Sequence, residues 1–202
     1  LLAFGTQFFD PDLDGDLDLF AANGHVLDNV GLIDQSTSYG QRNLLLRNDG
    51  GRFADISVAA GPGFDLQRVS RGSAVGDYDT DGDPDLLVFN SGQPLSLLRN
   101  DSGHGNHWIT VRLAGADGNP NGIGARVTAY SGDLVQTREL RGSRSYLSQS
   151  QLHVSLGLGH RSQLDDIEVR WPSGRLERFG PFAAGQVLVL IEGRGISAQP
   201  SP

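Results

Sequence analysis

The sequence predicts an all-β protein, in which partial β-propeller blade repeats are followed by a small β-sandwich or barrel. Two acidic loops of identical spacing recur 67 residues apart, and each is followed at once by an apolar strand. The second half of the chain is a series of short apolar segments bounded by glycine turns, without the period of an amphipathic helix. Repeats built from several strands without helices are typical of propeller blades.

Both acidic loops have the pattern D-x-D-x-D-G-D-x-D, at residues 10–18 and 77–85. Oxygen ligands two residues apart suit a compact calcium loop, because the first, third and fifth side chains converge on one ion. Glycine in the sixth place permits the sharp bend. The seventh residue can offer its backbone carbonyl, and the ninth carboxylate closes the shell. The candidate ligands are Asp10, Asp12, Asp14, Asp16, Asp18, Asp77, Asp79, Asp81, Asp83 and Asp85.

Electrostatic repulsion favours a bound cation in each loop. Two carboxylates about 6 Å apart repel each other by roughly 3 kcal/mol at an effective dielectric constant near 20, and every second residue of each loop is an aspartate. We expect one Ca²⁺ per loop rather than Mg²⁺, because Mg²⁺ requires tight octahedral geometry. The alternative is a pair of solvated acidic turns, which the recurrence of identical spacing disfavours.

The loops belong to a repeat that fills residues 1–103. A second shared piece, Leu-Leu-Arg-Asn-Asp, follows at 45–49 and at 97–101, and in the first unit Asn-Asp-Gly signals a tight hairpin turn. Each unit is therefore predicted to hold a few short antiparallel strands around a cation loop. A propeller needs about four to eight blades, so we expect upstream blades or another subunit to cover the open edges.

The composition of the chain changes near residue 104, because most acids lie before it and most arginines after it. We predict calcium-loop repeats over 1–104, a β domain over 105–193 and a flexible tail over 194–202. Within the β domain we expect strands at 107–113, 125–130, 135–140, 152–158, 167–171, 175–179 and 187–191. The chain has no methionine and no visible signal peptide, so we expect a processed product or the C-terminal part of a longer protein.

Charge and composition limit the classes of function. The net charge of −8 lies mainly on the two loops, and an acidic chain without a basic patch argues against nucleic-acid binding. No apolar run approaches the ~20 residues of a membrane span. The absence of cysteine excludes thiol catalysis and thiolate metal sites. Calcium loops of this kind bind at about 10⁻⁴–10⁻³ M, so we expect an extracellular, cell-surface or periplasmic location.

The sequence gives little support to catalysis or to zinc binding. His104 and His107 lie three residues apart, but no third ligand is near them. No Gly-x-Ser-x-Gly elbow supports a Ser/His/Asp triad. The pair Asp165 and Asp166 is more typical of a charged turn than of a glycosidase site.

Two further segments have both a functional and a structural interpretation. The glycines of residues 118–124 precede no helix, so we interpret them as turns rather than as a phosphate cradle. Residues 141–146 combine arginines with a tyrosine and could bind an acidic or sugar-like surface. A hairpin with outward arginines is the simpler interpretation of that segment.

The units that contain the acidic loops resemble FG-GAP/VCBS repeats, the blade units of integrin-like calcium-binding propellers. The second half is similar to the ASPIC/UnbV domain in the segments Asn-His-Trp at 106–108, Asn-Gly-Ile-Gly-Ala-Arg-Val at 121–127, Ser-Tyr-Leu-Ser-Gln-Ser at 145–150, Gly-Leu-Gly at 157–159 and Val-Arg-Trp-Pro-Ser-Gly at 169–174. Together the two parts resemble the cartilage acidic protein-like family over about residues 1–193. The resemblance implies a secreted or surface protein with a seven-bladed propeller, of which this sequence holds the last blade units.

The same resemblance implies a role for each aspartate of the loops. The side-chain ligand positions fall on Asp10, Asp12, Asp14, Asp18, Asp77, Asp79, Asp81 and Asp85. Asp16 and Asp83 take the position that offers a backbone carbonyl.

We expect a non-enzymatic, calcium-binding protein for adhesion or recognition outside the cytoplasm, with a protein or glycan partner. The alternative is a structural or accessory subunit of a larger assembly, whose partner covers the open blade edges. An accessory enzyme of secondary metabolism is less favoured, because no residue set offers a nucleophile with a base.

Overall fold

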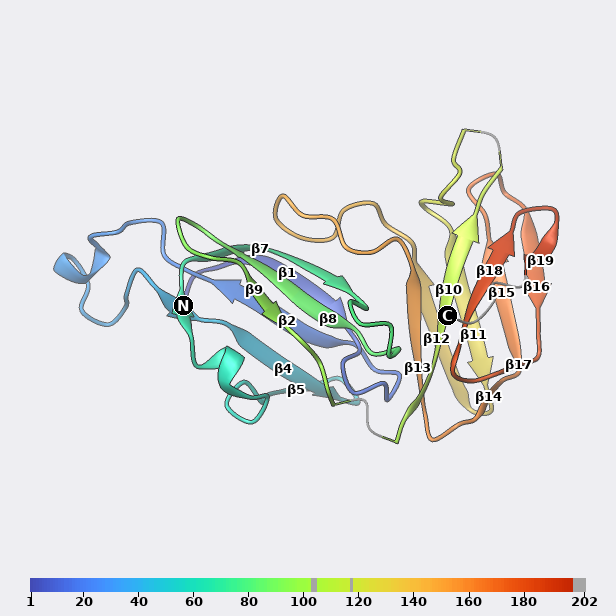
Figure 1. Cartoon of the computed structure of the whole chain (residues 1–202), viewed down its shortest axis with the longest axis horizontal. Coiled ribbons are helices and arrows are strands. Elements are labelled where there is room, and N and C mark those ends of the chain that lie inside the picture. Colours follow the sequence, from blue (N-terminus) through green and yellow to red (C-terminus); the bar gives the residue numbers. More distant parts are fainter. Residues whose placement is uncertain (103–104, 117, 198–202) are drawn as a thin grey trace.

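The protein is all-β, as the sequence predicts (Figure 1). The computed structural model describes residues 1–102, 105–116 and 118–197. Its sheets form two groups that lie side by side along the long axis of the molecule (Figure 1). The first group carries both acidic loops, and the second encloses a core of its own. Among the described residues, the sheets close into neither a propeller nor a barrel.

The first group contains two main antiparallel sheets. We call the sheet β1-β2-β4-β5 unit one and the sheet β7-β8-β9 unit two, while β3 pairs with β6. Short 3-10 helices lie in the connections at Val30–Leu32 and Pro62–Phe64. The strands are β1 (Ala3–Phe9), β2 (Asp18–Asn23), β3 (Gln41–Arg42), β4 (Leu44–Asp49), β5 (Arg52–Asp55), β6 (Gln67–Arg68), β7 (Ser70–Gly76), β8 (Asp85–Asn90) and β9 (Ser96–Leu98).

Unit one and unit two have the same strand register. An offset of 67 residues relates their first two strands, and the shared Leu-Leu-Arg-Asn-Asp piece relates the third. The acidic loop connects the first strand of each unit to the second. Equivalent residues pair across the strands in the rows Phe8–Leu19–Leu46 of unit one and Val75–Leu86–Leu98 of unit two. The repeat in the sequence is therefore also a repeat in structure.

One face of each unit packs against the other unit. This core buries apolar side chains because the strands alternate, so that every second residue points to the same face. Its buried members are Phe9, Phe20, Ala22, Leu45, Phe64, Leu86 and Val88, and Ile56, Val75 and Leu98 pack against them.

The predicted hairpin turn joins β4 to β5. It is centred on Gly50 and Gly51, whose φ angles are 58° and 91°, and Asp49 pairs with Arg52 across it. Glycine adopts these positive φ values without the steric cost of a Cβ atom.

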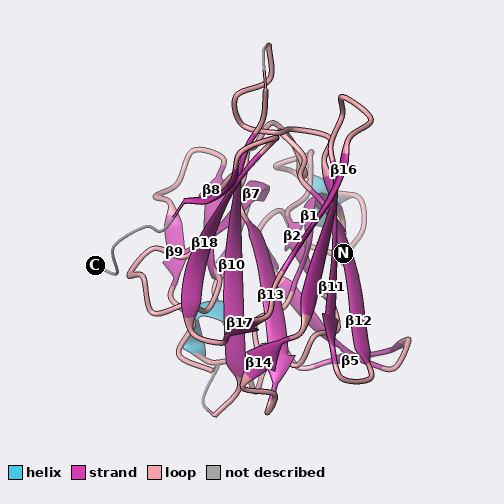
Figure 2. Ribbon diagram, turned by 90° about the vertical axis from the view of Figure 1, so that its right-hand side faces the viewer, coloured by secondary structure: helices cyan, strands magenta, loops and turns pink. Residues whose placement is uncertain are grey.

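In the second group, two sheets face each other across one core (Figure 2). The sheets have the orders β13-β10-β18-β19 and β12-β11-β15-β16, and β14 pairs with β17. The pair β10–β18 is parallel. The strands are β10 (His107–Ala114), β11 (Arg126–Ser131), β12 (Leu134–Glu139), β13 (Val154–Gly159), β14 (Gln163–Leu164), β15 (Asp166–Arg170), β16 (Leu176–Phe179), β17 (Phe182–Ala183), β18 (Gln186–Ile191) and β19 (Gly195–Ser197).

The strands predicted for the second half all appear, with ends that differ by one or two residues. The short strands β14, β17 and β19 were not predicted. Strand β19 pairs with β18, so ordered pairing extends into the predicted tail. The rest of that tail, residues 198–202, lies outside the described residues, as do Gly103 and His104 at the predicted domain boundary.

Candidate metal centres in the two acidic loops

The loops at residues 10–18 and 77–85, here loop one and loop two, share one backbone conformation. Leu13 and Thr80 hold equivalent positions and have φ angles of 59° and 62°. Gly15 and Gly82 both have a φ of 102°. A left-handed conformation costs a residue other than glycine about 1–2 kcal/mol. Its recurrence shows that the bend is a property of the loop pattern.

The first aspartate ties each loop closed. Asp10 is only 4% exposed, and its Oδ1 and Oδ2 accept hydrogen bonds from the backbone N–H groups of Asp14 at 3.1 Å and Gly15 at 3.0 Å. In loop two, Oδ2 of Asp77 accepts from the N–H of Gly82 at 3.1 Å. The repeated contact fixes the carboxylate at the centre of the bend.

Three carboxylates meet in each loop. Asp10, Asp12 and Asp14 each offer an oxygen, and these atoms lie within 4.8 Å of one another. Asp77, Asp79 and Asp85 form the set in loop two, so the third carboxylate comes from the fifth position of loop one and from the ninth position of loop two. Because Ca²⁺–oxygen distances are about 2.3–2.6 Å, one cation can contact all three oxygens of such a set.

Several carboxylate oxygens are buried without a hydrogen-bond partner among the described residues. They are Oδ1 of Asp12, Oδ2 of Asp18 and Oδ1 of Asp77. A buried acceptor without a donor costs about 1–3 kcal/mol, and more when it is charged. A cation would satisfy these atoms, and a set made only of oxygens suits Ca²⁺ rather than zinc.

Burial raises the pKa of four of the loop carboxyls. It raises the pKa of Asp10 to about 7, with a further contribution from the neighbouring charges of Asp14 and Asp12. Burial also raises the pKa of Asp18 to about 6, and it is the main cause of the raised pKa values of Asp14 and Asp77. A bound cation would offset both the mutual repulsion and the desolvation of carboxylates that are held together away from water.

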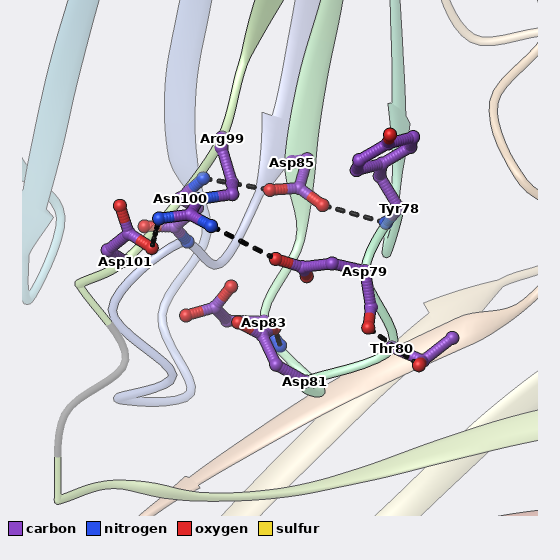
Figure 3. Close-up of polar contacts among 9 residues, drawn as sticks. All are labelled: Tyr78, Asp79, Thr80, Asp81, Asp83, Asp85, Arg99, Asn100 and Asp101. Carbon is purple, nitrogen blue, oxygen red and sulfur yellow. Dashed lines mark hydrogen bonds and ion pairs between the residues drawn. The ribbon is translucent and has the colours of Figure 1, made fainter. Parts of the chain in front are cut away.

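The structure does not bring all ten predicted ligands together. In the described residues, the three-carboxylate sets include neither Asp18 in loop one nor Asp81 in loop two. Oδ1 of Asp18 accepts from the N–H of Asn48 at 2.8 Å. Asp85 accepts from the N–H groups of Asn100 at 2.8 Å and of Tyr78 at 2.7 Å (Figure 3).

The side chains at the backbone-carbonyl positions point elsewhere. Oδ2 of Asp16 accepts from the N–H of Gly50 at 3.3 Å, at the tip of the β4–β5 hairpin. Asp83 is buried, and its N–H donates to Oδ1 of Asp81 at 3.2 Å (Figure 3). The backbone carbonyls of Asp16 and Asp83, rather than their side chains, stay the predicted ligands.

The shared Leu-Leu-Arg-Asn-Asp piece supports each loop, a role that the sequence analysis did not assign to it. Asn48 and Asn100 are equivalent residues, and the N–H of each donates to the ninth aspartate of its loop. The preceding arginine also lies beside the loop, since Arg99 pairs with Asp101 at 2.8 Å and approaches Asp79 at 3.9 Å (Figure 3). The recurrence of this piece after each loop is the sequence feature that could have indicated its supporting role.

The second group of sheets packs directly on loop one. The N–H of Gly159 donates to the carbonyl of Leu13 at 2.8 Å, and Arg138 donates to the carbonyl of Gly15 at 2.9 Å. Nδ2 of Asn106 donates to the carbonyl of Asp12 at 2.6 Å. Leu13 is 2% exposed as a result.

Loop two has its own contacts with the second group. Gly82 lies against the indole ring of Trp108, which a Cβ atom at residue 82 would overlap. The N–H of Asp77 donates to Oε1 of Gln151 at 3.0 Å, and the N–H of Gln151 donates to the carbonyl of Val75 at 2.9 Å. Both candidate metal loops therefore lie at the contact between the two groups of sheets.

The weaker catalytic candidates occupy structural positions. Asp165 accepts from the N–H of Gly132 at 2.7 Å, and Asp166 pairs with Arg178 at 3.2 Å. His107 is exposed at the start of β10, and His104 lies outside the described residues, so the pair forms no site that the structure can describe.

Residues 141–146 match the hairpin with outward arginines only in part: Arg141 is exposed and Ser145 bridges to Ser148, but residues 144–146 pack against other parts of the protein. Oγ of Ser145 lies 3.1 Å from Oγ of Ser73, and the ring centroid of Tyr146 lies 5.5 Å from that of Phe4. Arg144 donates to the carbonyl of Glu139 at 2.9 Å. The segment lies against both units, so it contributes to the contact between the two groups of sheets.

Part of the chain is similar to known proteins. The chain is similar to cartilage acidic protein 1 of Mus musculus, with 32% identity over 121 residues that cover 57% of this chain and 18% of that protein. It is also similar to cartilage acidic protein 1 of Homo sapiens, with 30% identity over 137 residues that cover 65% of this chain and 20% of that protein. The chain thus spans about a fifth of the length of these curated relatives.

Among the described residues, the structure holds no helix that is long and apolar enough to cross a membrane.

The family model described as ASPIC and UnbV matches residues 115–197. That range begins after β10 and ends with β19. The second group of sheets therefore carries an ASPIC/UnbV domain.

Proposed function

We propose that the chain is a calcium-binding, non-enzymatic recognition protein that acts outside the cytoplasm, with one Ca²⁺ in each acidic loop. One observation carries the proposal. Each loop gathers three carboxylate oxygens within 4.8 Å of one another, and each buries at least one carboxylate oxygen that has no hydrogen-bond partner among the described residues. The two loops share one backbone conformation and the carboxylates of the first and third positions.

The ligand chemistry favours Ca²⁺ over other divalent cations. Ca²⁺ takes six to eight oxygen ligands in flexible geometry. Three carboxylates, one of them able to bind through both oxygens, and a backbone carbonyl at Asp16 or Asp83 supply most of that shell, and water completes it. Loops of this kind bind at about 10⁻⁴–10⁻³ M, which is the reason for proposing an extracellular, cell-surface or periplasmic location.

We propose that units one and two are FG-GAP/VCBS repeats and serve as blades of a propeller. Their equal strand register and the cation loop between the first and second strands support this assignment. In this proposal Ca²⁺ makes the loops rigid, and the rigid loops position the ASPIC/UnbV domain and present a fixed surface to a protein or glycan partner.

Calorimetric titration with Ca²⁺ and thermal melting in Ca²⁺ or chelator test the proposal. We expect two bound ions and a higher melting temperature in Ca²⁺. Asp12→Asn should abolish site one alone, and Asp79→Asn should abolish site two alone, because each removes a carboxylate from one set. Asp133→Asn is the matched control, since the side chain of Asp133 is 89% exposed and pairs only with Arg161 among the described residues.

Either of two results would contradict the proposal. One is the absence of binding heat together with identical melting in Ca²⁺ and in chelator. The other is an equal loss of both sites in the Asp133→Asn control. A parallel titration with Mg²⁺ checks selectivity and should show weaker binding.

A structural or accessory subunit of a larger assembly is the second candidate function. The observation that favours it is a set of exposed apolar side chains on unit two, including Leu87 and Phe89. Sizing of native material should then show a stable complex, whereas a monomer at all concentrations would count against this candidate.

A further inference from the structure

Arg138 brings a positive charge from the ASPIC/UnbV domain against loop one. It lies on β12, and its Nη2 donates to the carbonyl of Gly15, at the bend of the loop, at 2.9 Å. The same nitrogen donates to Oε1 of Gln136 at 2.9 Å, so a contact on its own strand holds the guanidinium in place. Arg138 is half-buried, and a charge acts more strongly on its neighbours where less water screens it.

The guanidinium of Arg138 and the carboxylates of loop one influence each other. Burial raises the pKa of Asp10 to about 7, and the charge of Arg138 opposes this rise. Burial lowers the pKa of Arg138, and the charges of Asp10 and Asp16 oppose that fall. Arg138 therefore offsets part of the negative charge of loop one. A cation that enters the loop is repelled by the same positive charge.

The contacts of loop two with the domain come from neutral side chains. Gly82, the equivalent of Gly15, lies against the indole ring of Trp108. The N–H of Asp77 donates to Oε1 of Gln151 at 3.0 Å. Neither contact adds a charge to the loop. The two loops share a backbone conformation, but the domain gives them different electrostatic surroundings.

The charges that the repeat itself supplies are the same for both loops. Each loop has five aspartates. Arg47 and Arg99 are equivalent exposed residues, and they pair with Asp49 at 2.9 Å and with Asp101 at 2.8 Å (Figure 3). Because these charges recur, they do not distinguish the loops, whereas Arg138 does.

We infer that Arg138 lowers the Ca²⁺ affinity of loop one, so that loop two fills first and the ASPIC/UnbV domain sets the calcium concentration at which loop one fills. The inference rests on the proposed calcium binding and adds a regulating residue to it. Gly15 is the sixth residue of the loop, whereas the predicted carbonyl ligand is the seventh, Asp16. Arg138 therefore takes no predicted ligand from the ion, and its charge is the cause of the lower affinity.

Calorimetric titration of single-site variants with Ca²⁺ tests the inference at low salt and about pH 8, where Asp10 is ionised. Asp79→Asn leaves site one, and Asp12→Asn leaves site two. When Arg138→Gln is added to Asp79→Asn, binding should tighten at least about threefold, because a unit charge has about this effect on a divalent ion ~10 Å away in water. When it is added to Asp12→Asn, binding should change far less.

Two further variants separate the charge of Arg138 from its structural role. Arg138→Lys keeps the charge and loses the guanidinium fork, so site one should stay within about twofold of its affinity with Arg138. Arg178→Gln removes the same charge from β16, at the opposite edge of the sheet from β12, and should change neither site. A change that only loosens the domain would weaken site one, so the direction of the effect identifies its cause.

Three results would overturn the inference and leave the proposed function intact. They are equal or weaker binding at site one in Arg138→Gln, equal tightening in Arg138→Lys, and loop one filling before loop two in the wild-type chain. Tightening in Arg138→Lys would assign the effect to the hydrogen bond instead of the charge. If neither single-site variant binds Ca²⁺, the proposed function fails together with the inference.

Discussion

At the scale of single residues, loop one depends on a close fit between Asp10 and the ASPIC/UnbV domain. Gly157 on β13 approaches the loop so closely that a Cβ atom there would overlap Oδ2 of Asp10 and lie 2.5 Å from the carbonyl carbon of Leu13. A carboxylate and a backbone segment have little freedom to move away. Glycine is therefore required at this position for space rather than for backbone conformation.

Gly157→Ala should lower the free energy of unfolding by about 1–3 kcal/mol or more. It should also weaken Ca²⁺ binding at loop one while leaving loop two unchanged. Gly31→Ala is the matched control, because a Cβ at Gly31 meets no atom within 4 Å, and its effect should stay within about 0.5 kcal/mol. Denaturant unfolding and calorimetry measure the two effects, and equal stability of the two variants would contradict the prediction.

The raised pKa values of Asp10, about 7, and Asp18, about 6, give a pH dependence. Without Ca²⁺, the folded state holds more protons than the unfolded state between about pH 4 and 7, so these groups stabilise it less as the pH rises through that window. Ca²⁺ requires the ionised carboxylates. The part of the melting-temperature gain that comes from Ca²⁺ in loop one should therefore shrink as the pH falls from about 7 to about 5.

Melting in Ca²⁺ and in calcium-free buffer across this range measures the effect. Burial lowers the pKa of His153 from 6.5 to about 4, with a further contribution from Arg112. This histidine destabilises the fold as the pH falls below about 6.5 in both conditions, so its effect cancels in the difference. A gain from Ca²⁺ that stays constant down to about pH 5 would contradict the assignment of these aspartates as ligands.

Residue spacing predicted the acidic loops but not which oxygens meet. The pattern treats Asp81 and Asp79 alike, yet the structure places Asp79 in the three-carboxylate set of loop two and Asp81 outside it. Two members of that set have contacts with residues distant in sequence: Asp79 lies 3.9 Å from Arg99, and Asp85 accepts from the N–H of Asn100. A local pattern does not contain that information.

At the scale of elements, Asn48 and Asn100 hold equivalent positions, but their side chains bond to different parts of the structure. Nδ2 of Asn48 donates to the carbonyl of Leu17, within its own unit, at 3.2 Å. Nδ2 of Asn100 donates to the carbonyl of Pro84 at 3.2 Å and also to that of Pro11 in loop one at 2.7 Å. Asn100 therefore joins the two loops.

Asn100→Ala should destabilise the protein by about 1–3 kcal/mol, because it removes the side-chain donor of the Pro84 carbonyl and leaves the Pro11 carbonyl with only the Ser102 hydroxyl, at 3.3 Å. Asn48→Ala should cost less, since it removes a single contact of this kind. Denaturant unfolding of the two variants in Ca²⁺ compares them directly. The interpretation fails if Asn48→Ala proves the more destabilising change.

Strands with an alternating or continuous apolar pattern could be predicted from the sequence, and those without it could not. The run at 187–191 belongs to β18, and the alternation at 107–113 belongs to β10. By contrast, β14 and β17 have two residues each and exist because they pair with each other. Two residues are too few for a hydrophobic period, so such strands depend on tertiary structure.

At the scale of the whole molecule, the candidate metal loops connect the two groups of sheets. Loop one contacts the ASPIC/UnbV domain through Leu13, and loop two contacts it through Gly82 and Trp108. The sequence had no signal for this contact, because Leu13 and Gly159 are far apart in the chain. Loss of Ca²⁺ should therefore loosen the domain as well as the loops.

Tryptophan fluorescence can measure this coupling. The chain has two tryptophans: Trp108 lies on Gly82, while Trp171 is 2% exposed in the core of the domain. Adding chelator should shift the emission of Trp108 to longer wavelength, because its ring gains contact with water. Trp108→Phe should remove the shift, and a shift that persists in this variant would place the change in the domain core instead.

The equivalent residues Leu13 and Thr80 share a backbone conformation but differ in the surroundings of their side chains. Both have the same left-handed backbone, but Leu13 is buried against the ASPIC/UnbV domain and Thr80 is exposed. The repeat thus determines the course of the chain at this position, and the neighbouring domain determines the side chain. A loop two grafted into unit one in place of loop one would keep its carboxylates. It would, however, leave a cavity at the surface of the ASPIC/UnbV domain where Leu13 now packs.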